Sequence, residues 1–436
     1  MKAIRCELCG DNHLIKKDGF FECESCGTKY TLEEAKKLFV SGTVSIEGDV
    51  KVTQTDFTIR AGVLEKYNGS DVDVIIPNTV SVIGDRAFKD CIGLKSISLP
   101  ESVKEIGNDA FCGCKNLENI RLPNSLKILQ SYSFSGCSSL ISIEIPEGVT
   151  EIGISCFAYC VNLESILLPL SLKTIRNFAF LNCSSLKTVT IPDGVLQIGN
   201  RAFNGCKKLR NISIPDSVNH LDVGVFCDCI SLASINLPQN IQQIDDLLFS
   251  GCCSLESILI PESVTIIGSH AFSKCTNLKY IKLPKSLTVI GQAAFSDCVG
   301  LMSIDLPAGL QNIECHAFSN CSCITNVIIP GSVKLAANAF VNCSNLNNVT
   351  VPEINNDIDI ISYFTHDPFG ISPFGNTPFE KKKFAKLDSL RKAKEEEDKR
   401  MLYTERRRKH VCQHCGGDFK GLFTKICSSC GKQKDY

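Results

Sequence analysis

Three residue types recur with one period over most of this chain, and that repeat limits the possible folds more than any other feature. Proline, phenylalanine and cysteine each return every 23 residues, and the last unit is one residue shorter. The repeat accounts for 13 of the 16 prolines, so the spacing is not a matter of composition. Twelve units in register indicate stacked copies of one short motif. The recurring prolines run from Pro77 to Pro352, the phenylalanines from Phe88 to Phe340 and the cysteines from Cys91 to Cys343.

One unit, 80–100, places eight apolar or thiol residues at fixed positions. A unit of this size cannot bury them alone, so neighbouring units must cover one another. The alternation over 97–99 predicts a short strand with one buried face, which Pro100 ends because it lacks an amide donor. The three- and four-residue spacing over 87–94 predicts one helical or 3₁₀ turn. Gly84, which recurs in several units, predicts a tight turn with positive φ.

These features predict an α/β repeat solenoid with short parallel strands and short helical turns over residues 57–352. Adjacent parallel strands lie about 4.7–4.9 Å apart, so about twelve coils span an arc of roughly 55–60 Å. Inward-facing Phe, Leu, Ile and Cys would form continuous ladders along this arc.

The unit I-G-x-x-A-F-x-x-C-x-x-L-x-x-I-x-L-P, as at 106–123, resembles the BspA-type leucine-rich-repeat family. The resemblance covers residues 57–352, and the stretch 57–69 resembles the N-terminal leader of that family. It implies a curved solenoid used for binding, often at bacterial or protist surfaces.

The cysteines of the repeat keep the phase of the predicted core, so we expect small buried hydrophobic residues there. A metal-binding or redox ladder is the alternative. Six further thiols fall outside that phase and are candidates for surface-reactive groups. They are Cys112, Cys156, Cys227, Cys253, Cys315 and Cys323.

Two paired CxxC motifs lie at each end of the chain, and each set of four thiolates suits one tetrahedral Zn²⁺. Each cysteine pair ends in glycine, which lets the backbone curl around the metal. Both ends resemble zinc ribbons, with a full ligand set that leaves no open position for catalysis. An iron site of the rubredoxin type would use the same ligands, and His13 and His414 are expected to be ordinary loop residues. The two predicted structural zinc sites comprise Cys6, Cys9, Cys23 and Cys26, and Cys412, Cys415, Cys427 and Cys430.

The rest of the chain divides by composition. A capping box at 31–34 predicts a short helix to Phe39, and alternating residues over 43–52 predict strands. Three Pro-Phe pairs past Pro352 predict either a cap on the open core or a linker. The predicted organisation is a zinc ribbon at 1–30, a short helix and strand linker at 31–56, a solenoid of about 12 repeats at 57–352, a C-terminal cap or irregular linker at 353–379, a charged helix at 380–410 and a zinc ribbon at 411–436.

Charge separates the solenoid from the predicted helix. Residues 380–410 hold 13 Lys/Arg and 7 Asp/Glu, a net charge of +6. Residues 41–379 hold 22 basic and 31 acidic residues, a net charge of −9, which makes the solenoid a poor match for a phosphate backbone. The helix beside a ribbon is therefore either a solvated spacer or a basic arm that contacts nucleic acid.

The outward position between the last two core residues of each unit predicts what the concave face of the solenoid offers a ligand. It carries both charge signs and three aliphatic residues, which suits a protein or peptide better than a phosphate backbone. A solvated surface with no ligand is the other possibility. The candidate partner-binding residues in this row are Arg121, Glu144, Leu167, Asn236, Leu259, Lys282, Asp305 and Ile328.

No enzyme motif is present in the sequence: we find no phosphate-binding loop, nucleophile elbow or HExxH helix. His270 and His316 share one phase of the repeat and are expected to lie on the surface. The first seven residues lack an apolar signal core, and no apolar run approaches the ~20 residues of a membrane helix. We therefore expect a cytoplasmic protein with neither a membrane partner nor a small-molecule substrate.

Three functions follow as hypotheses. The first is a non-enzymatic protein–protein interaction scaffold that binds a protein or peptide on the solenoid and uses the zinc ribbons as docking modules. The second is a nucleic-acid-associated factor acting through the basic helix and the C-terminal ribbon. The third, implied by the family resemblance alone, is a surface adhesin.

Overall fold

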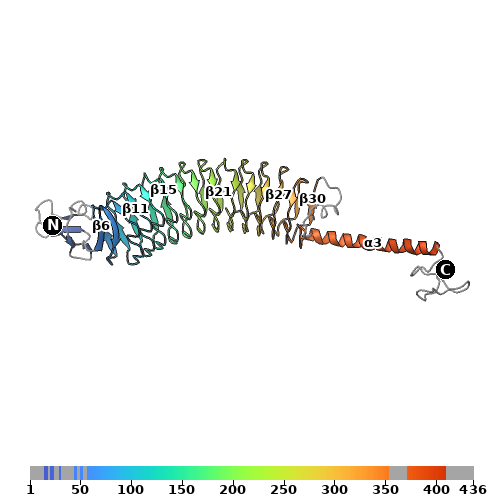
Figure 1. The fold of residues 1–436 in the computed structure, drawn as a ribbon, viewed down its shortest axis with the longest axis horizontal. Helices are drawn as coiled ribbons and strands as arrows, with labels where there is room; N and C mark the ends of the chain where they lie inside the picture. The colour runs from blue at the N-terminus through green and yellow to red at the C-terminus, as the bar shows by residue number, and fades with distance from the viewer. Residues whose placement is uncertain are drawn as a thin grey trace.

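The computed structural model describes residues 14–17, 20–23, 29–30, 44–46, 50–52, 56–352 and 371–408. Figure 1 shows a bowed row of stacked coils with one long helix, α3 (Pro378–Arg408), leaving its C-terminal end. The predicted repeat solenoid with parallel strands is confirmed. None of the described helices is both long enough and apolar enough to span a membrane.

Short antiparallel strands precede the solenoid. Strands β1 (Leu14–Lys17), β2 (Phe20–Cys23) and β3 (Lys29–Tyr30) form one sheet, and β4 (Val44–Ile46) pairs with β5 (Val50–Val52). The alternation over 43–52 predicted this last pair of strands. The helix predicted from Thr31 to Phe39 lies outside the described residues.

Two rows of parallel strands run the length of the solenoid, where the sequence predicted one. The row with three residues per strand, here called the long ladder, contains the predicted strand: Ile97 lies at the centre of β10 and points inward. Its strands are β8 (Asp73–Ile75), β10 (Ser96–Ser98), β12 (Asn119–Arg121), β14 (Ser142–Glu144), β16 (Ser165–Leu167), β19 (Asn211–Ser213), β21 (Ser234–Asn236), β23 (Ser257–Leu259), β25 (Tyr280–Lys282), β28 (Asn326–Ile328) and β30 (Asn348–Thr350).

The second row, here called the short ladder, has two residues per strand. It contains the buried residue Ile83 and the residue at the same position of each later coil. A hairpin of β6 (Phe57–Arg60) and β7 (Val63–Tyr67) begins it, because β7 pairs in parallel with the first short strand. The short strands are β9 (Val82–Ile83), β11 (Glu105–Ile106), β13 (Ile128–Leu129), β15 (Glu151–Ile152), β17 (Thr174–Ile175), β18 (Gln197–Ile198), β20 (His220–Leu221), β22 (Gln243–Ile244), β24 (Ile266–Ile267), β26 (Val289–Ile290), β27 (Asn312–Ile313) and β29 (Lys334–Leu335).

The helical turn predicted over 87–94 is wrong: this segment is a series of tight turns in every coil. Alternate amides of the segment donate to the next coil, as from Phe88 to the Ala110 carbonyl at 2.8 Å. The amides between them donate three residues back, as from Cys91 to the Phe88 carbonyl at 3.1 Å. Over 86–91, half of the donors are therefore used between coils, which a helix with its internal i to i−4 bonds does not allow.

The prediction of positive φ at Gly84 and its equivalents is also wrong. Two other residues in each coil have positive φ, such as Arg86 at 60° and Asp90 at 58°. These turns direct the amides to the next coil. Where glycine occupies this position, the coils approach closely: a Cβ on Gly84 would lie 2.8 Å from the Leu64 carbonyl oxygen, and one on Gly107 2.8 Å from the Asp85 amide nitrogen.

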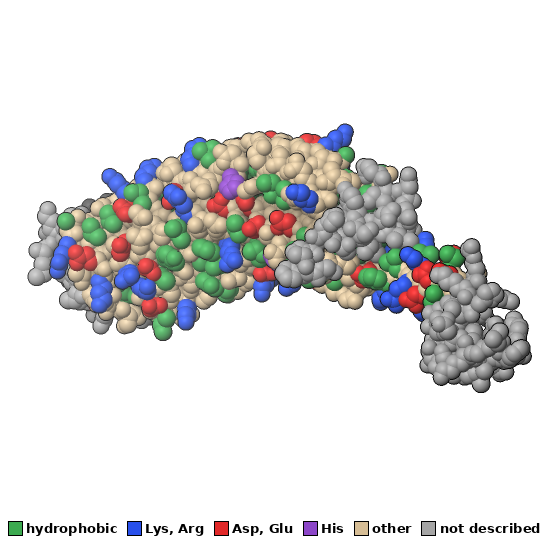
Figure 2. All heavy atoms as spheres, turned by 45° about the vertical axis from the view of Figure 1, so that its right-hand side comes forward, with side chains coloured by type: hydrophobic (Ala, Val, Ile, Leu, Met, Phe, Trp, Pro, Cys, Tyr) green, Lys and Arg blue, Asp and Glu red, His purple; other side chains and the backbone are tan. Residues whose placement is uncertain are grey.

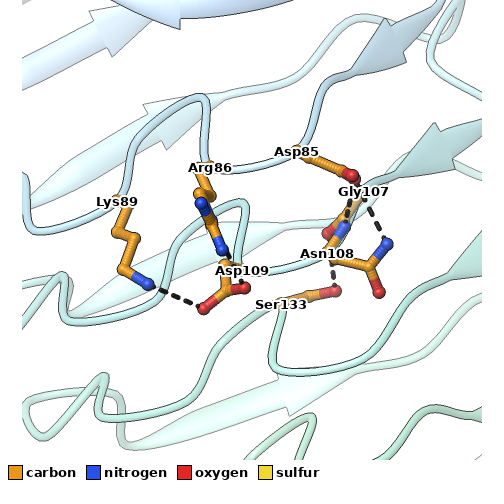
Figure 3. Close-up of polar contacts among 7 residues, drawn as sticks. All are labelled: Asp85, Arg86, Lys89, Gly107, Asn108, Asp109 and Ser133. Atoms are coloured by element: carbon orange, nitrogen blue, oxygen red, sulfur yellow. Dashed lines mark hydrogen bonds and ion pairs between the residues drawn. The ribbon is translucent and has the colours of Figure 1, made fainter.

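Polar side chains add contacts between coils at the turns, and Figure 3 shows one set. The Asp85 carboxylate accepts from the backbone amide of Asn108 at 2.7 Å and from its side chain at 3.3 Å. The Asp109 carboxylate lies 3.0 Å from the Lys89 ammonium group. The Ser133 hydroxyl donates to the Gly107 carbonyl at 3.1 Å. Such bonds join neighbouring coils, and Ser133 makes its bond from a fully buried position.

The core is a continuous stack of aromatic rings. Consecutive repeat phenylalanines have ring centroids 4.9–5.8 Å apart and interplanar angles of 21° or less, an offset-stacked arrangement. Tyr67 continues the stack at the N-terminal end at 5.1 Å from Phe88. Phe374 continues it at the C-terminal end at 5.8 Å from Phe340.

Residues 371–379 cover part of the last coil. Amides of Asn338, Phe340 and Asn342 donate to the carbonyls of Ser372, Pro373 and Gly375, at 3.1, 2.7 and 2.8 Å. This segment therefore accepts the bonds that a further coil would accept. Phe374 and Phe379 are both buried in the core, as expected of a cap; residues 353–370 lie outside the described range.

We predict that Phe203→Ala lowers the free energy of unfolding by about 3–5 kcal/mol, as measured by urea denaturation. Its fully buried ring stacks between those of Phe180 and Phe226, at 5.1 and 5.8 Å, and truncation leaves a cavity. The control is Leu170→Ala at a side chain that is 78% exposed, for which we expect a change within about 0.5 kcal/mol. Equal losses in the two variants would contradict this account of the core.

Candidate functional site

The outward face of the long ladder carries all eight candidate partner-binding residues. In each strand the central residue points into the core and its two neighbours point outward, as in β16, where Ile166 is 7% exposed and Leu167 59% exposed. Arg121, Glu144 and Lys282 are likewise exposed on this face. Parallel pairing with a 23-residue step places the candidates in one row.

Three aliphatic side chains break the polar character of this row. Leu167, Leu259 and Ile328 are 59%, 67% and 61% exposed. At the spacing of parallel strands, Leu167 and Ile328 lie about 34 Å apart along the solenoid. Figure 2 shows hydrophobic, acidic and basic side chains interspersed over the visible surface of the molecule. A surface of this extent and composition is typical of protein recognition and too broad for a small ligand.

Tyr280 belongs to the same face and was missed by the sequence reasoning. It begins β25, its ring is 57% exposed, and its hydroxyl lies 3.3 Å from the Met302 sulfur. Elsewhere in the long ladder this position holds Ser, Asn or Thr, or Asp in β8. That departure from the row is the signal by which the residue was detectable.

Several neighbours in the row that contains Tyr280 bond to one another. The Ser234 hydroxyl donates to Asn211 at 2.6 Å, and the Asn348 amide donates to Asn326 at 2.8 Å. These short polar side chains satisfy one another along the ladder. The neighbouring row of candidate residues instead varies in charge and size from coil to coil, as a surface that discriminates between partners requires.

The cysteines of the repeat have a structural role in the described coils. From Cys114 onward each thiol donates to the carbonyl of the phenylalanine in the preceding coil, with sulfur–oxygen distances of 3.0–3.3 Å. Burial raises the pKa of these thiols; those of Cys160, Cys298 and Cys343 reach about 12. A thiol held protonated in this way is a poor nucleophile and metal ligand.

The thiols outside the core phase differ in exposure. Cys156 is fully buried, because it takes the place that alanine holds in most coils, so its assignment as a surface candidate is wrong. Burial also raises the pKa of Cys227, to about 11. Cys315 and Cys323 are exposed, and Cys112 and Cys253 are partly buried.

One charged cluster was not found from the sequence. The His220 Nε2 lies 2.9 Å from an Asp222 oxygen and 3.2 Å from an Asp245 oxygen in the next coil. Both aspartates occupy the phase of Gly84, and burial raises the pKa of Asp245. The histidine therefore bridges two coils at a point where the usual glycine contact is lost.

The two histidines singled out by phase have a conformational explanation. His270 and His316 have φ of 56° and 60°, at the first positive-φ position of their coils. Residues of many types take this conformation at the same position of other coils. The His316 side chain is exposed.

The predicted zinc ligands lie almost entirely outside the described residues. Only the backbone of Cys23, at the end of β2, is described. Cys6, Cys9, Cys26, Cys412, Cys415, Cys427 and Cys430 are outside the described ranges. Within those ranges, no group of three or more His, Cys, Asp or Glu side chains is arranged to hold a metal.

Known proteins share this repeat in sequence and in structure. The sequence model of the BspA type leucine rich repeat region, with six repeat copies, matches residues 66–184, 150–275 and 246–366. A leucine-rich repeat protein from Bacteroides ovatus is 29% identical in sequence, with a TM-score of 0.50 over 73% of this chain and 95% of its own. A leucine rich cell surface protein from Faecalibacterium prausnitzii is 27% identical, with a TM-score of 0.48 over 71% and 96%. No curated protein matches the chain.

We predict that the solenoid loses stability as pH rises above about 9. The thiol pKa is near 9.0 in the unfolded chain and about 12 for Cys160 in the folded one, so unfolding releases protons over this range. The stabilisation is complete below pH 9 and falls by up to about 1.4 kcal/mol per thiol for each further pH unit. Urea midpoints measured from pH 7 to pH 10.5 test this.

The matched variant replaces three consecutive core thiols, Cys160, Cys183 and Cys206, by alanine. It should be less stable at pH 7 and lose stability less steeply above pH 9, because fewer thiols ionise on unfolding. A midpoint that stays constant up to pH 10.5 in the unmodified protein would refute the prediction.

Proposed function

Since the chain belongs to the BspA-type leucine-rich repeat family, we propose that it is a non-enzymatic interaction protein whose long-ladder face binds a protein or peptide partner. The observation that carries the proposal is the row of exposed side chains in which Leu167, Leu259 and Ile328 stand among charged residues. Exposed aliphatic groups over such a length favour burial against a second macromolecule.

The charge of this row supports a protein partner over nucleic acid. Arg121 and Lys282 alternate along it with Glu144 and Asp305, so the face has no continuous basic track for phosphates. The mixed signs instead offer the complementary pairs that fix the register of one protein on another. Basic residues gather on α3, whose first turns meet the long ladder only at its C-terminal end, beside Ile328.

The partner prediction is tested with the double variant Leu167→Arg and Leu259→Arg. Affinity capture from the native host, quantified by mass spectrometry, should show at least a tenfold loss of the main bound protein. Truncation of a hot-spot residue near the centre of an interface costs about 2 kcal/mol or more, and a buried arginine adds a desolvation cost. Recovery equal to that of the unmodified protein would exclude this face.

The control variant carries the same charge change elsewhere. Leu170→Arg and Leu196→Arg alter side chains that are 78% and 52% exposed and lie outside the long ladder. We expect this variant to recover the partner as the unmodified protein does. A loss in both variants would indicate a nonspecific charge effect.

We further propose that the two terminal cysteine sets form structural zinc ribbons that act as docking modules of a cytoplasmic protein. The CxxC spacing supports this, as does the hairpin of β1 and β2, which follows the second cysteine of the N-terminal set and ends at the third. Four thiolates fill a tetrahedral Zn²⁺ site, and the metal would supply much of the folding energy of so short a segment.

Elemental analysis of the purified protein should give about two zinc ions per chain. Replacing Cys412 and Cys415 by serine should leave about one, because a CxxC pair supplies half of one ligand set. The serine variant retains the N-terminal set as an internal reference. Iron in place of zinc, or a metal content unaffected by the substitutions, would contradict the assignment.

A further inference from the structure

The C-terminal end of the solenoid is covered on one side only. The segment 371–376 accepts the amides of the last turns, and the Phe379 amide donates to the Leu346 carbonyl at 3.0 Å. Strand β30, in contrast, pairs with β28 on one edge, and no strand in the described part of the chain pairs with its other edge. Among the described residues, the long ladder therefore ends in an open strand edge.

The repeat identifies which backbone groups face that opening. In the preceding coil, the Thr325 carbonyl accepts from Asn347 at 3.0 Å and the Ile329 amide donates to Thr350 at 2.8 Å. The equivalent groups one coil later are the Asn347 carbonyl and the Val351 amide. They point to where a further strand would lie, as do the amide and carbonyl of Val349 between them.

A cleft of about 640 Å³ opens beside this edge, between the last two long strands and the first turns of α3. That volume is within the range of ordinary ligand sites, about 300–1,000 Å³. Three of the lining residues are lysines and none is acidic. The lining residues are Asn326, Val327, Ile328, Asn347, Asn348, Val349, Thr350, Phe379, Lys382, Lys383 and Lys386.

The helical wall of the cleft is fixed to the core. The Thr377 hydroxyl accepts from the Glu380 amide at 3.1 Å, and the Glu380 carboxylate accepts from the Asn376 amide at 3.0 Å, which caps α3. The Lys383 ammonium group lies 5.2 Å from the centroid of the buried Phe379 ring. Figure 1 shows α3 leaving the solenoid next to β30. Lys382 and Lys386, one turn apart and both exposed, are thus held at the cleft.

We propose that this cleft binds an extended acidic peptide of a partner protein, which adds as a further strand to the open edge of β30. The backbone groups of Asn347, Val349 and Val351 would pair with the peptide backbone, as in other cases of strand addition. Lys382 and Lys386 would pair with its carboxylates. The inference rests on the proposed binding function and assigns the chemistry of one partner segment.

The observations favour a peptide over other anions. Lysines alone would accept a phosphate as readily as a carboxylate, but a phosphate cannot use the donor and acceptor groups of a strand edge. The carboxylates of an alternating acidic and β-branched segment would face the helix, while its backbone completes the ladder.

The test uses the full-length protein and a fluorescein-labelled hexapeptide, Glu-Val-Glu-Val-Glu-Val, in a fluorescence anisotropy titration. We expect saturable binding that weakens with salt. Lys382→Glu with Lys386→Glu should raise the Kd at least tenfold. Lys392→Glu with Lys399→Glu makes the same charge change farther along α3 and should alter the Kd less than twofold.

Two further probes separate strand addition from simple charge attraction. The same hexapeptide with alternate backbone nitrogens methylated keeps its charge but cannot complete the ladder, so we expect its binding to be lost. Polyphosphate should compete weakly. Equal binding of the methylated peptide, or equal competition by polyphosphate, would overturn the proposal.

Occupation of the cleft by the chain itself is a distinct outcome. Residues 353–370 carry Glu353, Asp357, Asp359 and Asp367 and no Lys or Arg. If the hexapeptide binds only after these four are replaced by the corresponding amides, the cleft belongs to this segment and the proposal fails. Absence of binding in every variant also refutes it.

The test of the long-ladder face is independent of the test of the cleft. The Leu167→Arg and Leu259→Arg variant should bind the hexapeptide with unchanged affinity, because both residues lie outside the cleft. If the hexapeptide does not bind but that variant loses the partner, the proposal for the cleft is rejected and the proposed function of the long-ladder face is retained.

Discussion

The structure depends on how the backbone amides of each coil divide their hydrogen bonds between their own coil and the next one. In the turn segment of each coil, alternate amides donate within the coil and to the next coil, as at Cys91 and Phe88. The positive-φ residues make this possible, because they rotate every second amide outward. The inter-coil bonds then set a spacing at which the phenylalanine rings stack at 4.9–5.8 Å. Neither the ring stack nor the thiol bonds would form at another coil spacing.

This division explains what was predictable from the sequence and what was not. The period and the apolar phases fix which side chains lie inward, so Phe88, Ile97 and their equivalents were correctly placed in the core. The spacing of Ala87, Phe88, Cys91 and Leu94 is the same in a helical turn and in this turn series. Periodicity reports which residues share a face, and it does not report where their amides donate.

Other features depended on contacts that only stacking creates. Gly84 is required by the approach of the preceding coil, while positive φ is taken by residues as different as Arg86, Phe178 and Leu247. No residue type marks that position. The bond from the Cys114 thiol to the preceding coil likewise joins residues 26 apart, which no local pattern indicates. The outward rows are another case, because Tyr280 stands out only against its equivalents in other coils.

Each coil forms hydrogen bonds with the coils on either side, so the last coil needs other partners. Its turns and its long strand end in different ways. Ser372, Pro373 and Gly375 imitate the turns of a further coil, and Phe374 extends the aromatic stack. Nothing in the described residues imitates a further long strand, although α3 begins within bonding distance of Leu346. An exposed strand edge favours pairing with any available strand, and proteins commonly protect such edges with lysine. Here the lysines lie at one wall of a cleft beside the edge. They would therefore repel a basic strand and attract an acidic one.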